Sequence, residues 1–236
     1  MELNIQERLN SMLGYRQQCK DAILRTRHNV PMDEAMKAIE TIGKAYVADF
    51  EIDDDNRFVY ENLVKWVHGD ESMMAIDLES KGMTSGKLKS GILLAGTIGS
   101  GKTLCMEIIK AYASIVGAKI QIYPNEFKNL SWINWHATQI CDRYSSIGNI
   151  EGLNDVDILY IEDLGCESSS VSYMGNKTDV IARLLEYRGD FNNRMTLITT
   201  NIPLNSSVME ERYGRRVVSR LKKLNYFELK GKDRRN

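Results

Sequence analysis

The sequence has little of what would mark a secreted, zinc-dependent or membrane protein. Of its 236 residues only four are cysteine and three are histidine, and neither type is clustered. Because no C-x-x-C pair occurs, the cysteines predict no zinc site and fit reduced thiols in a cytosol. No apolar run approaches the ~20 residues that span a bilayer, and the start MELNIQERLN is too polar for a signal peptide. We therefore expect a cytoplasmic protein that makes no membrane contact.

Excess charge of either sign is also lacking. The 31 Lys and Arg residues nearly balance the 32 Asp and Glu residues, which leaves a net charge of -1 at pH 7. This balance excludes a protein that coats nucleic acid by charge alone, so any such contact must be local. The 43% of hydrophobic and 27% of charged residues are typical of a soluble globular protein.

The chain changes its pattern along its length. Apolar residues recur at helical spacing over residues 5–23 and 32–42, and a third helical stretch follows over residues 56–69. From residue 91 onward, short apolar runs alternate with helical segments, which predicts a parallel sheet covered by helices on both faces. We therefore divide the chain into a helical partner-binding region, residues 1–50, and one α/β domain, residues 51–236.

The α/β domain is expected to contain five strands and four helices. The strands are predicted at residues 91–96, 119–124, 156–165, 195–201 and 225–229. The helices are predicted at residues 102–116, 126–145, 178–188 and 208–223.

A glycine-rich segment, GTIGSGKT at residues 96–103, matches the phosphate-binding pattern G-x-x-x-x-G-K-[ST]. It follows an apolar strand and precedes a helix, which is the context that this pattern needs. Backbone N–H groups would surround a phosphate, Lys102 would reach the outer phosphates, and Thr103 would ligate Mg²⁺. The residues expected to contact the nucleotide are Gly96, Thr97, Ile98, Gly99, Ser100, Gly101, Lys102, Thr103 and Leu104.

Polar residues at the ends of two later strands complete the predicted site. Glu162 and Asp163 follow the buried run ILYI, and Asn201 follows the run MTLITT. We predict that Glu162 helps to hold Mg²⁺ and that Asp163 polarises the attacking water. Asn201 is predicted to hold that water or to sense the outer phosphate.

A second nucleotide motif is rejected on its context. The sequence NKTD at residues 176–179 matches a guanine-reading motif. Only about ten residues separate it from the acid pair, which leaves no room for the strand and helix that a GTPase needs between the two elements. The segment before it, SSSVSYMG, is also not an apolar strand.

With these pieces in this order, the chain resembles the DnaC/IstB family of AAA+ ATPases, which includes helicase loaders and transposition helper ATPases. The resemblance covers roughly residues 51–236 and rests on GTIGSGKT, LYIEDLG, LITTNIP, and YGRRVVSRL followed by FELKGKDRR. It implies a P-loop fold with a five-stranded parallel sheet and no C-terminal lid domain. It also implies ATP and Mg²⁺ as ligands. By this resemblance Lys102 and Thr103 are the Walker A pair, Glu162 and Asp163 the Walker B acids, and Asn201 sensor 1.

The order of the two acids departs from the family pattern. The family usually has Asp-Asp or Asp-Glu, whereas this chain has Glu162-Asp163. The longer first side chain leaves the efficiency of hydrolysis open.

Four arginines lie within ERYGRRVVSR, residues 211–220. The resemblance places Arg216 and Arg220 in the arginine-finger segment, which acts on the ATP of a neighbouring subunit. We expect Arg220 to be the finger, with Arg216 as the alternative, and we assign Arg212 and Arg215 to solvent or DNA. The competing interpretation is a basic helix face paired with Glu210 and Glu211.

DNA and protein partners have weaker signals. Residues 211–236 form a basic end, and Trp132, Trp135 and His136 are either platforms for single-stranded DNA or parts of the core. The apolar faces within residues 1–50 are either a packed hairpin or a docking surface for a replicative helicase.

Three functions fit these observations. The leading hypothesis is an ATP-dependent helicase loader that forms a homo-oligomer with ATP and engages single-stranded DNA and a replicative helicase. The second is an IstB-like helper that delivers a transposase to target DNA. The third is an adaptor that binds ATP without hydrolysing it.

Overall fold

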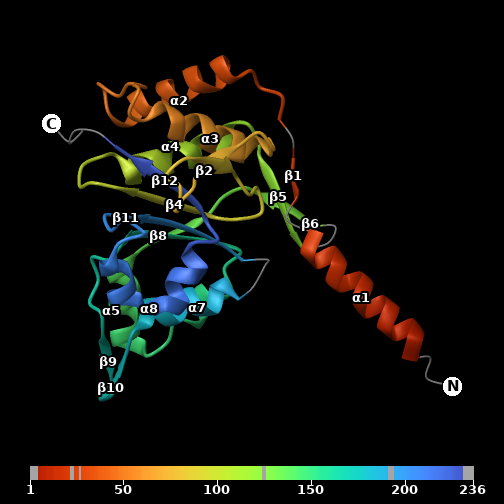
Figure 1. Ribbon diagram of the computed structural model, residues 1–236, viewed down its shortest axis with the longest axis vertical. Helices are drawn as coiled ribbons and strands as arrows, with labels where there is room; N and C mark the ends of the chain where they lie inside the picture. The colour runs from red at the N-terminus through yellow and green to blue at the C-terminus, as the bar shows by residue number, and fades with distance from the viewer. Residues whose placement is uncertain (1–4, 22–23, 27, 124–125, 191–193, 231–236) are drawn as a thin grey trace.

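A parallel sheet of five strands forms the centre of the molecule (Figure 1). The computed structural model describes residues 5–21, 24–26, 28–123, 126–190 and 194–230. The central strands lie in the order β12, β4, β11, β8, β7. Their bounds are β4 (Ile92–Gly96), β7 (Ile133–His136), β8 (Ile158–Leu164), β11 (Met195–Thr200) and β12 (Asn225–Leu229). The predicted fold class is confirmed.

Helices cover both faces of this sheet, as Figure 1 shows. One face carries α2 (Met32–Tyr46), α3 (Arg57–His68) and α4 (Lys102–Ile115). The other carries α5 (Ala137–Ile147), α7 (Val180–Gly189) and α8 (Ser207–Leu221), and the short α6 (Glu151–Asn154) lies beside α7. Each layer buries its own apolar core against the sheet. The inner strands β4 and β8 are therefore rich in Ile and Leu, because both of their faces are covered.

Three small antiparallel sheets surround the central one. They pair β1 (Leu24–Arg25) and β6 (Glu126–Asn129) with β5 (Lys119–Tyr123), β2 (Met74–Ile76) with β3 (Met83–Ser85), and β9 (Val171–Tyr173) with β10 (Asn176–Thr178).

The second strand of the central sheet was predicted at the wrong place. The predicted strand at residues 119–124 is β5, which belongs to a peripheral sheet, and β7 takes the edge position beside β8. The predicted helix over residues 126–145 is also wrong, because α5 begins only at Ala137. Here His136 forms a capping box with Gln139, so the helix starts directly after β7.

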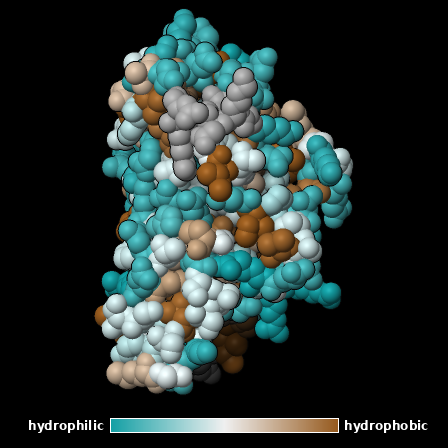
Figure 2. Space-filling view, turned by 90° about the vertical axis from the view of Figure 1, so that its left-hand side faces the viewer, coloured by the Kyte–Doolittle hydropathy of each residue, from teal (hydrophilic) through white to brown (hydrophobic). Residues whose placement is uncertain are grey.

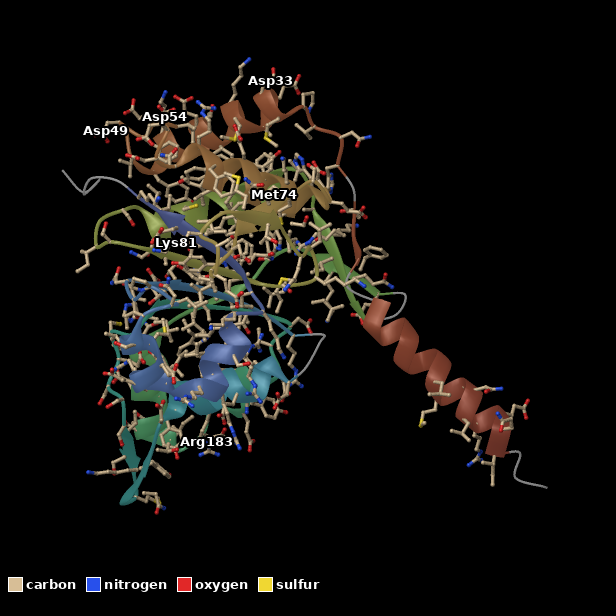
Figure 3. All side chains as sticks on the ribbon, in the orientation of Figure 1. Asp33, Asp49, Asp54, Met74, Lys81 and Arg183 are labelled. Atoms are coloured by element: carbon tan, nitrogen blue, oxygen red, sulfur yellow. The ribbon has the colours of Figure 1, made fainter. Side chains whose placement is uncertain are left out.

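The segment assigned to partner binding has two parts with different surroundings. The side chains of Ala35, Met36 and Ile39 on α2 are buried in the core that also contains α3 and α4. The boundary predicted between residues 50 and 51 therefore does not coincide with a break in packing. By contrast, α1 (Ile5–Asp21) extends away from the body of the molecule (Figures 1 and 3).

The surface has a mixed character. Figure 2 shows a face on which hydrophilic residues predominate and hydrophobic ones lie in small separate groups. Asp33, Asp49 and Asp54 lie along the outer side of the α2–α3 layer, whereas Arg183 lies at the opposite end of the molecule (Figure 3). None of the helices in the described part of the chain combines the length and apolarity that crossing a membrane requires.

Candidate nucleotide site

The glycine-rich segment connects the end of β4 to the start of α4, as predicted. Gly99 and Gly101 have φ values of 79° and 89°, in the left-handed region that residues with a Cβ rarely adopt. Gly101 is also the N-cap of α4. The loop therefore turns tightly and leads its backbone to the amino end of a helix, where N–H groups have no partner within the helix.

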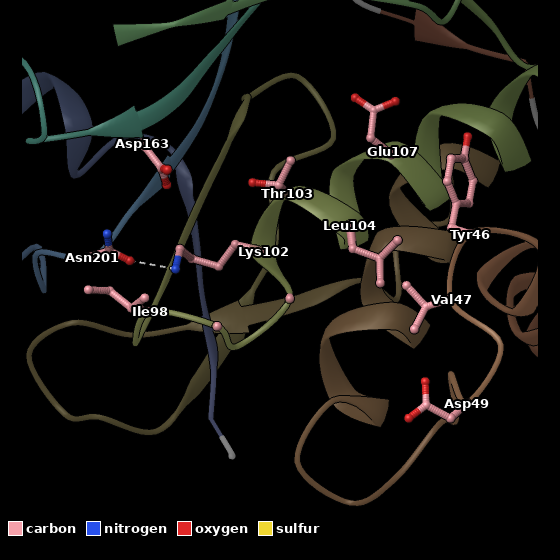
Figure 4. A pocket seen from close by; sticks show the side chains of 12 residues that line it. Tyr46, Val47, Asp49, Ile98, Lys102, Thr103, Leu104, Glu107, Asp163 and Asn201 are labelled. Atoms are coloured by element: carbon pink, nitrogen blue, oxygen red, sulfur yellow. Dashed lines mark hydrogen bonds between the residues drawn. The ribbon is translucent and has the colours of Figure 1, made fainter. Parts of the chain in front are cut away.

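Lys102 points back into this loop and reaches the neighbouring strand. Its Nζ donates to the carbonyl oxygens of Gly96 and Thr97 at 3.0 and 2.8 Å and to Oδ1 of Asn201 at 2.7 Å (Figure 4). The lysine is 5% exposed. The structure thus brings together the predicted Walker A lysine and the predicted sensor residue, which are 99 positions apart in the sequence.

The two acids near the end of β8 have different surroundings. Glu162 accepts a hydrogen bond from the Thr103 hydroxyl at 2.7 Å. Hydroxyl and carboxylate oxygens are ligands that Mg²⁺ prefers, so these two side chains are suited to hold the ion together. Asp163 lines the adjoining pocket instead, and its Oδ2 lies 3.6 Å from Nε2 of His136.

Asp163 has an unusual backbone conformation. Its φ is 52°, a left-handed value that costs a residue other than glycine about 1–3 kcal/mol. The Asp163 N–H donates to Oγ1 of Thr199 at 3.1 Å, and the Thr199 hydroxyl also lies 3.1 Å from the hydroxyl of Tyr160. Burial raises the pKa of the Tyr160 phenol, so this group stays neutral at pH 7. A buried polar network therefore supports the turn that directs the Asp163 carboxylate to the pocket.

A pocket of about 790 Å³ opens beside the loop. This volume is within the range of small-ligand sites, roughly 300–1,000 Å³. One side is formed by the P-loop, Asp163 and Asn201, and the other by Tyr46, Val47 and Asp49 at the end of α2 (Figure 4). The sequence reasoning missed these last three residues, because nothing in their spacing connects them with the glycine-rich segment.

Two of the proposed DNA platforms have other surroundings. Trp132 is only 3% exposed and packs edge-on against Trp66, with ring centroids 6.5 Å apart. Of the two interpretations left open for Trp132, a core residue is therefore the one that the structure supports. Trp135 on β7 is half-buried, and the guanidinium of Arg143 lies 5.8 Å from its ring. His136 lies beside Asp163, a position that was not predicted.

The rejected guanine motif is a structural element. Residues 176–178 form β10, the second strand of a hairpin. Asp179 is the N-cap of α7, and its Oδ1 accepts a hydrogen bond from the N–H of Ala182 at 2.9 Å.

Helix α8, which carries the four arginines, is bent in its middle. Gly214 has φ 77° and ψ 161°, outside the helical region. Before the bend, Arg212 donates to the carboxylate of Glu167, whose side chain is 1% exposed. The assignment of Arg212 to solvent or DNA is therefore wrong. After the bend, Arg215 is 91% exposed and pairs with Glu210 at 2.6 Å, as the competing interpretation predicted.

The two predicted finger residues lie in the second half of α8. Arg220 donates to Oδ1 of Asp190 through Nε at 3.1 Å and through Nη2 at 2.7 Å. Arg216 is exposed, and in the described part of the chain its side chain makes no hydrogen bond or ion pair. Arg220 lines a second pocket together with Gly91 and Thr196, which lie where β4 and β11 begin. The structure therefore separates Arg220 from the P-loop, which lies where the strands end.

Comparison with known proteins gives matches to structures only. No protein-family model matches the sequence, and no curated protein matches it significantly. The crystal structure of DnaI is 19% identical with a TM-score of 0.52, and the match covers 92% of this chain and 100% of that one. The DnaC helicase loader is 16% identical with a TM-score of 0.52, over 78% of this chain and 95% of that one. A candidate primosome component from Streptococcus pyogenes serotype M3 is 18% identical with a TM-score of 0.53, over 84% and 98%.

These matches define the class of protein by its fold. The chain has the fold of these structures, with a P-loop after a strand of a five-stranded parallel sheet. It shares this fold with DnaI and with the DnaC helicase loader, which confirms the DnaC-like resemblance at the level of the fold.

Proposed function

We propose that the protein is an ATPase of DNA replication that loads a replicative helicase onto single-stranded DNA. The observation that carries the proposal is the convergence of Lys102, Thr103, Glu162, Asp163 and Asn201 at one edge of the sheet. Their separation in sequence makes a chance meeting improbable, and each side chain has the chemistry that phosphoryl transfer to water requires. The fold shared with the DnaC helicase loader supports replication as the setting.

Within the site we assign a role to each side chain. Lys102 and the loop amides would bind the phosphates of ATP. Thr103 and Glu162 would hold Mg²⁺, which supplies neutralisation of the phosphate charge. Asp163 would accept a proton from the attacking water, and Asn201 would orient that water. The strained backbone of Asp163 supports a functional role, because such strain persists where the surroundings enforce it.

The remaining charge stabilisation would come from a second subunit. Arg220 lies at the edge of the sheet opposite the P-loop, and Arg216 precedes it by four residues on the same helix, so they are suited to a neighbour's ATP rather than to their own. An arginine supplied in this way is worth roughly 10³ to 10⁵ in rate. We therefore propose that ATP binds between subunits and promotes assembly of a homo-oligomer.

The protruding α1 is our candidate for contact with the helicase. Ile5, Leu9, Met12 and Leu13 recur at helical spacing, and all are at least 40% exposed. Exposed apolar residues in such a row are typical of a helix that docks into a partner's groove. The core packing of α2 limits this proposal to α1 rather than to the whole of residues 1–50.

Subunit mixing tests the central claim. One variant, Arg216→Ala/Arg220→Ala, keeps the nucleotide site but lacks both arginines; the other, Lys102→Ala, lacks the nucleotide site but keeps both arginines. Each alone should hydrolyse ATP at least ~10³-fold more slowly than the wild type in the presence of single-stranded DNA. The mixture should recover activity, because one subunit binds ATP and the other supplies the arginines.

Two controls sharpen this assay. Arg215→Ala lies in the same half of α8 and breaks only the exposed pair with Glu210, so it should keep wild-type activity. Single substitutions of Arg216 and Arg220 identify which residue is the finger. A mixture that stays inactive although both variants are folded would refute the arrangement in trans.

A further inference from the structure

A buried carboxylate lies between the nucleotide site and the arginine-bearing helix. Glu167 follows the acid pair by four residues, and its side chain is 1% exposed. Its Oε2 accepts a hydrogen bond from the N–H of Gly165 at 2.8 Å. Glu167 therefore holds the backbone of the loop that begins at Asp163.

The other oxygen of Glu167 belongs to a closed network on α8. Oε1 accepts from Nη2 of Arg212 at 3.0 Å and from the hydroxyl of Tyr213 at 2.5 Å, and Nε of Arg212 donates to the Tyr213 oxygen at 3.2 Å. Arg212 also donates to the backbone carbonyl of Glu167. Burial raises the pKa of Tyr213, so its hydroxyl keeps the proton that it donates. Every polar group in this small network has a partner, which is the condition for a buried charge to hold one geometry.

The network ends where α8 bends. Gly214 comes directly after Tyr213, and a Cβ added there would meet no atom within 4 Å. Because the backbone is not helical at Gly214, the direction of the second half of α8 is not fixed by a continuous hydrogen-bond ladder. That second half carries Arg216 and Arg220.

We propose that Glu167 is a positioning residue that couples the two functional edges of the sheet. It ties the loop after Asp163 to the last turn of α8 before the bend, so that nucleotide in a subunit's own pocket changes where that subunit holds Arg216 and Arg220. This inference rests on the proposed function, because it assumes a nucleotide at the P-loop and an arginine acting on a neighbour.

Hydrogen–deuterium exchange measures this coupling directly. A non-hydrolysable ATP analogue with Mg²⁺ is added to the full chain, and exchange is followed in residues 96–104 and 214–221. In the wild type both segments should change on binding. In Glu167→Gln the first segment should change as before, while the change in the second should fall at least threefold.

The two readouts separate the possible failures. No protection in residues 96–104 of the wild type would overturn the proposed function and this inference with it. Protection there, with the same response of residues 214–221 in wild type and Glu167→Gln, would overturn the inference alone. The matched control is Arg215→Ala, which breaks an exposed ion pair on the same helix and should respond as the wild type does.

Loss of folding is the obvious complication, because Glu167→Gln leaves the partly buried Arg212 without its counter-charge. The double substitution Glu167→Gln/Arg212→Gln removes both charges and should recover thermal stability without recovering the response of residues 214–221. If the response returned together with the stability, the network would be purely structural and the inference wrong.

Subunit mixing gives a second test with a kinetic readout. The mixture for this test pairs Arg216→Ala/Arg220→Ala with Asp163→Asn, which keeps ATP binding and donates the arginines. Glu167→Gln is placed either in the subunit that donates the arginines or in the subunit that hydrolyses ATP. We expect at least a tenfold lower rate in the first case and less than a twofold change in the second. An unchanged rate with the substitution in the donor, or equal losses in both positions, would contradict the proposal.

Discussion

The strands of the central sheet all end on one side, here called the carboxyl edge, and all begin on the other, the amino edge. These two edges have opposite characters. At the carboxyl edge, Lys102 and Asn201 contact each other beside an open pocket of about 790 Å³. At the amino edge, Arg188 is fully buried and donates to the carbonyls of Leu153, Val156 and Met195 at 2.7–2.9 Å. Burial lowers the pKa of Arg188 to about 10, so it remains charged at pH 7. One edge is arranged for a ligand, whereas the buried arginine at the other is satisfied by the protein's own carbonyl groups.

This difference explains why the chain's arginines do not serve its own P-loop. In a parallel sheet each connecting helix runs antiparallel to the strands. The end of α8 therefore lies at the edge where β12 begins. β4 spans five residues, about 17 Å, and this length separates Arg220 from the P-loop. Even a long arginine side chain is too short to reach across that distance to the phosphates of a nucleotide at the P-loop. Under the proposed function, the two edges would form one active site only when a second subunit is added.

Lys102→Ala should have the largest effect, because it removes the cation from the carboxyl edge. Hydrogen bonds to a charged group are worth about 1.5–3 kcal/mol each. Loss of two such bonds to phosphate should weaken ATP binding at least ~100-fold. Isothermal titration with ATP and Mg²⁺ measures this. Lys110→Ala, on the same helix but outside the loop, should bind ATP like the wild type, and retained affinity in Lys102→Ala would refute the phosphate site.

Asp163→Asn and Glu162→Gln should affect different functions of the carboxyl edge. The first should affect the attack of water, and the second the binding of Mg²⁺. A positioned general base typically contributes 10² to 10⁴ in rate, so Asp163→Asn should lower turnover at least ~100-fold with ATP affinity unchanged. Glu162→Gln should instead raise the Mg²⁺ concentration needed for activity, because a neutral amide binds the ion less well. Steady-state ATPase assays across a Mg²⁺ series distinguish the two. An unchanged rate in Asp163→Asn would remove it from catalysis, and a wild type without turnover would favour the adaptor.

Much of the carboxyl edge could be predicted from the sequence. The P-loop depends on a few consecutive residues, and its glycines, lysine and threonine are recognisable wherever they follow a strand and begin a helix. Glu162, Asp163 and Asn201 could also be predicted, since polar residues directly after buried strands must lie at the edge where those strands end. These are local patterns combined with one rule of topology.

Features that depend on distant packing could not be predicted. β5 and β7 are both short, β7 has the sequence INWH with no apolar run to mark it, and only the surrounding chain decides which of them pairs with β8. Tyr46, Val47 and Asp49 reach the pocket because α2 packs against α4. The pairing of Glu167 with Arg212 spans 45 positions and follows no spacing rule. Arg212 was assigned wrongly and Trp132 was left open for the same reason, because burial decides the role of each and composition does not.

Asp190→Asn should have the smallest effect. It tests the ion pair that holds Arg220 at the amino edge. Arg220 is held by Asp190, which is 61% exposed, and an exposed ion pair of this kind contributes at most about 1 kcal/mol. Neutralising Asp190 should release Arg220 toward a neighbour's phosphate. We expect ATP-dependent assembly, measured by sedimentation velocity, to occur at about two- to fivefold lower protein concentration.

A matched substitution separates release of Arg220 from a general change of surface charge. Glu210→Gln removes the same charge from α8 but frees Arg215 instead, so it should leave the assembly concentration unchanged. The effect of Asp190→Asn should also shrink as salt rises, because the lost attraction is between screened surface charges. Weaker assembly in Asp190→Asn would mean that the ion pair holds Arg220 ready for its neighbour. The amino edge would then be prearranged for a second subunit, as the carboxyl edge is for its ligand.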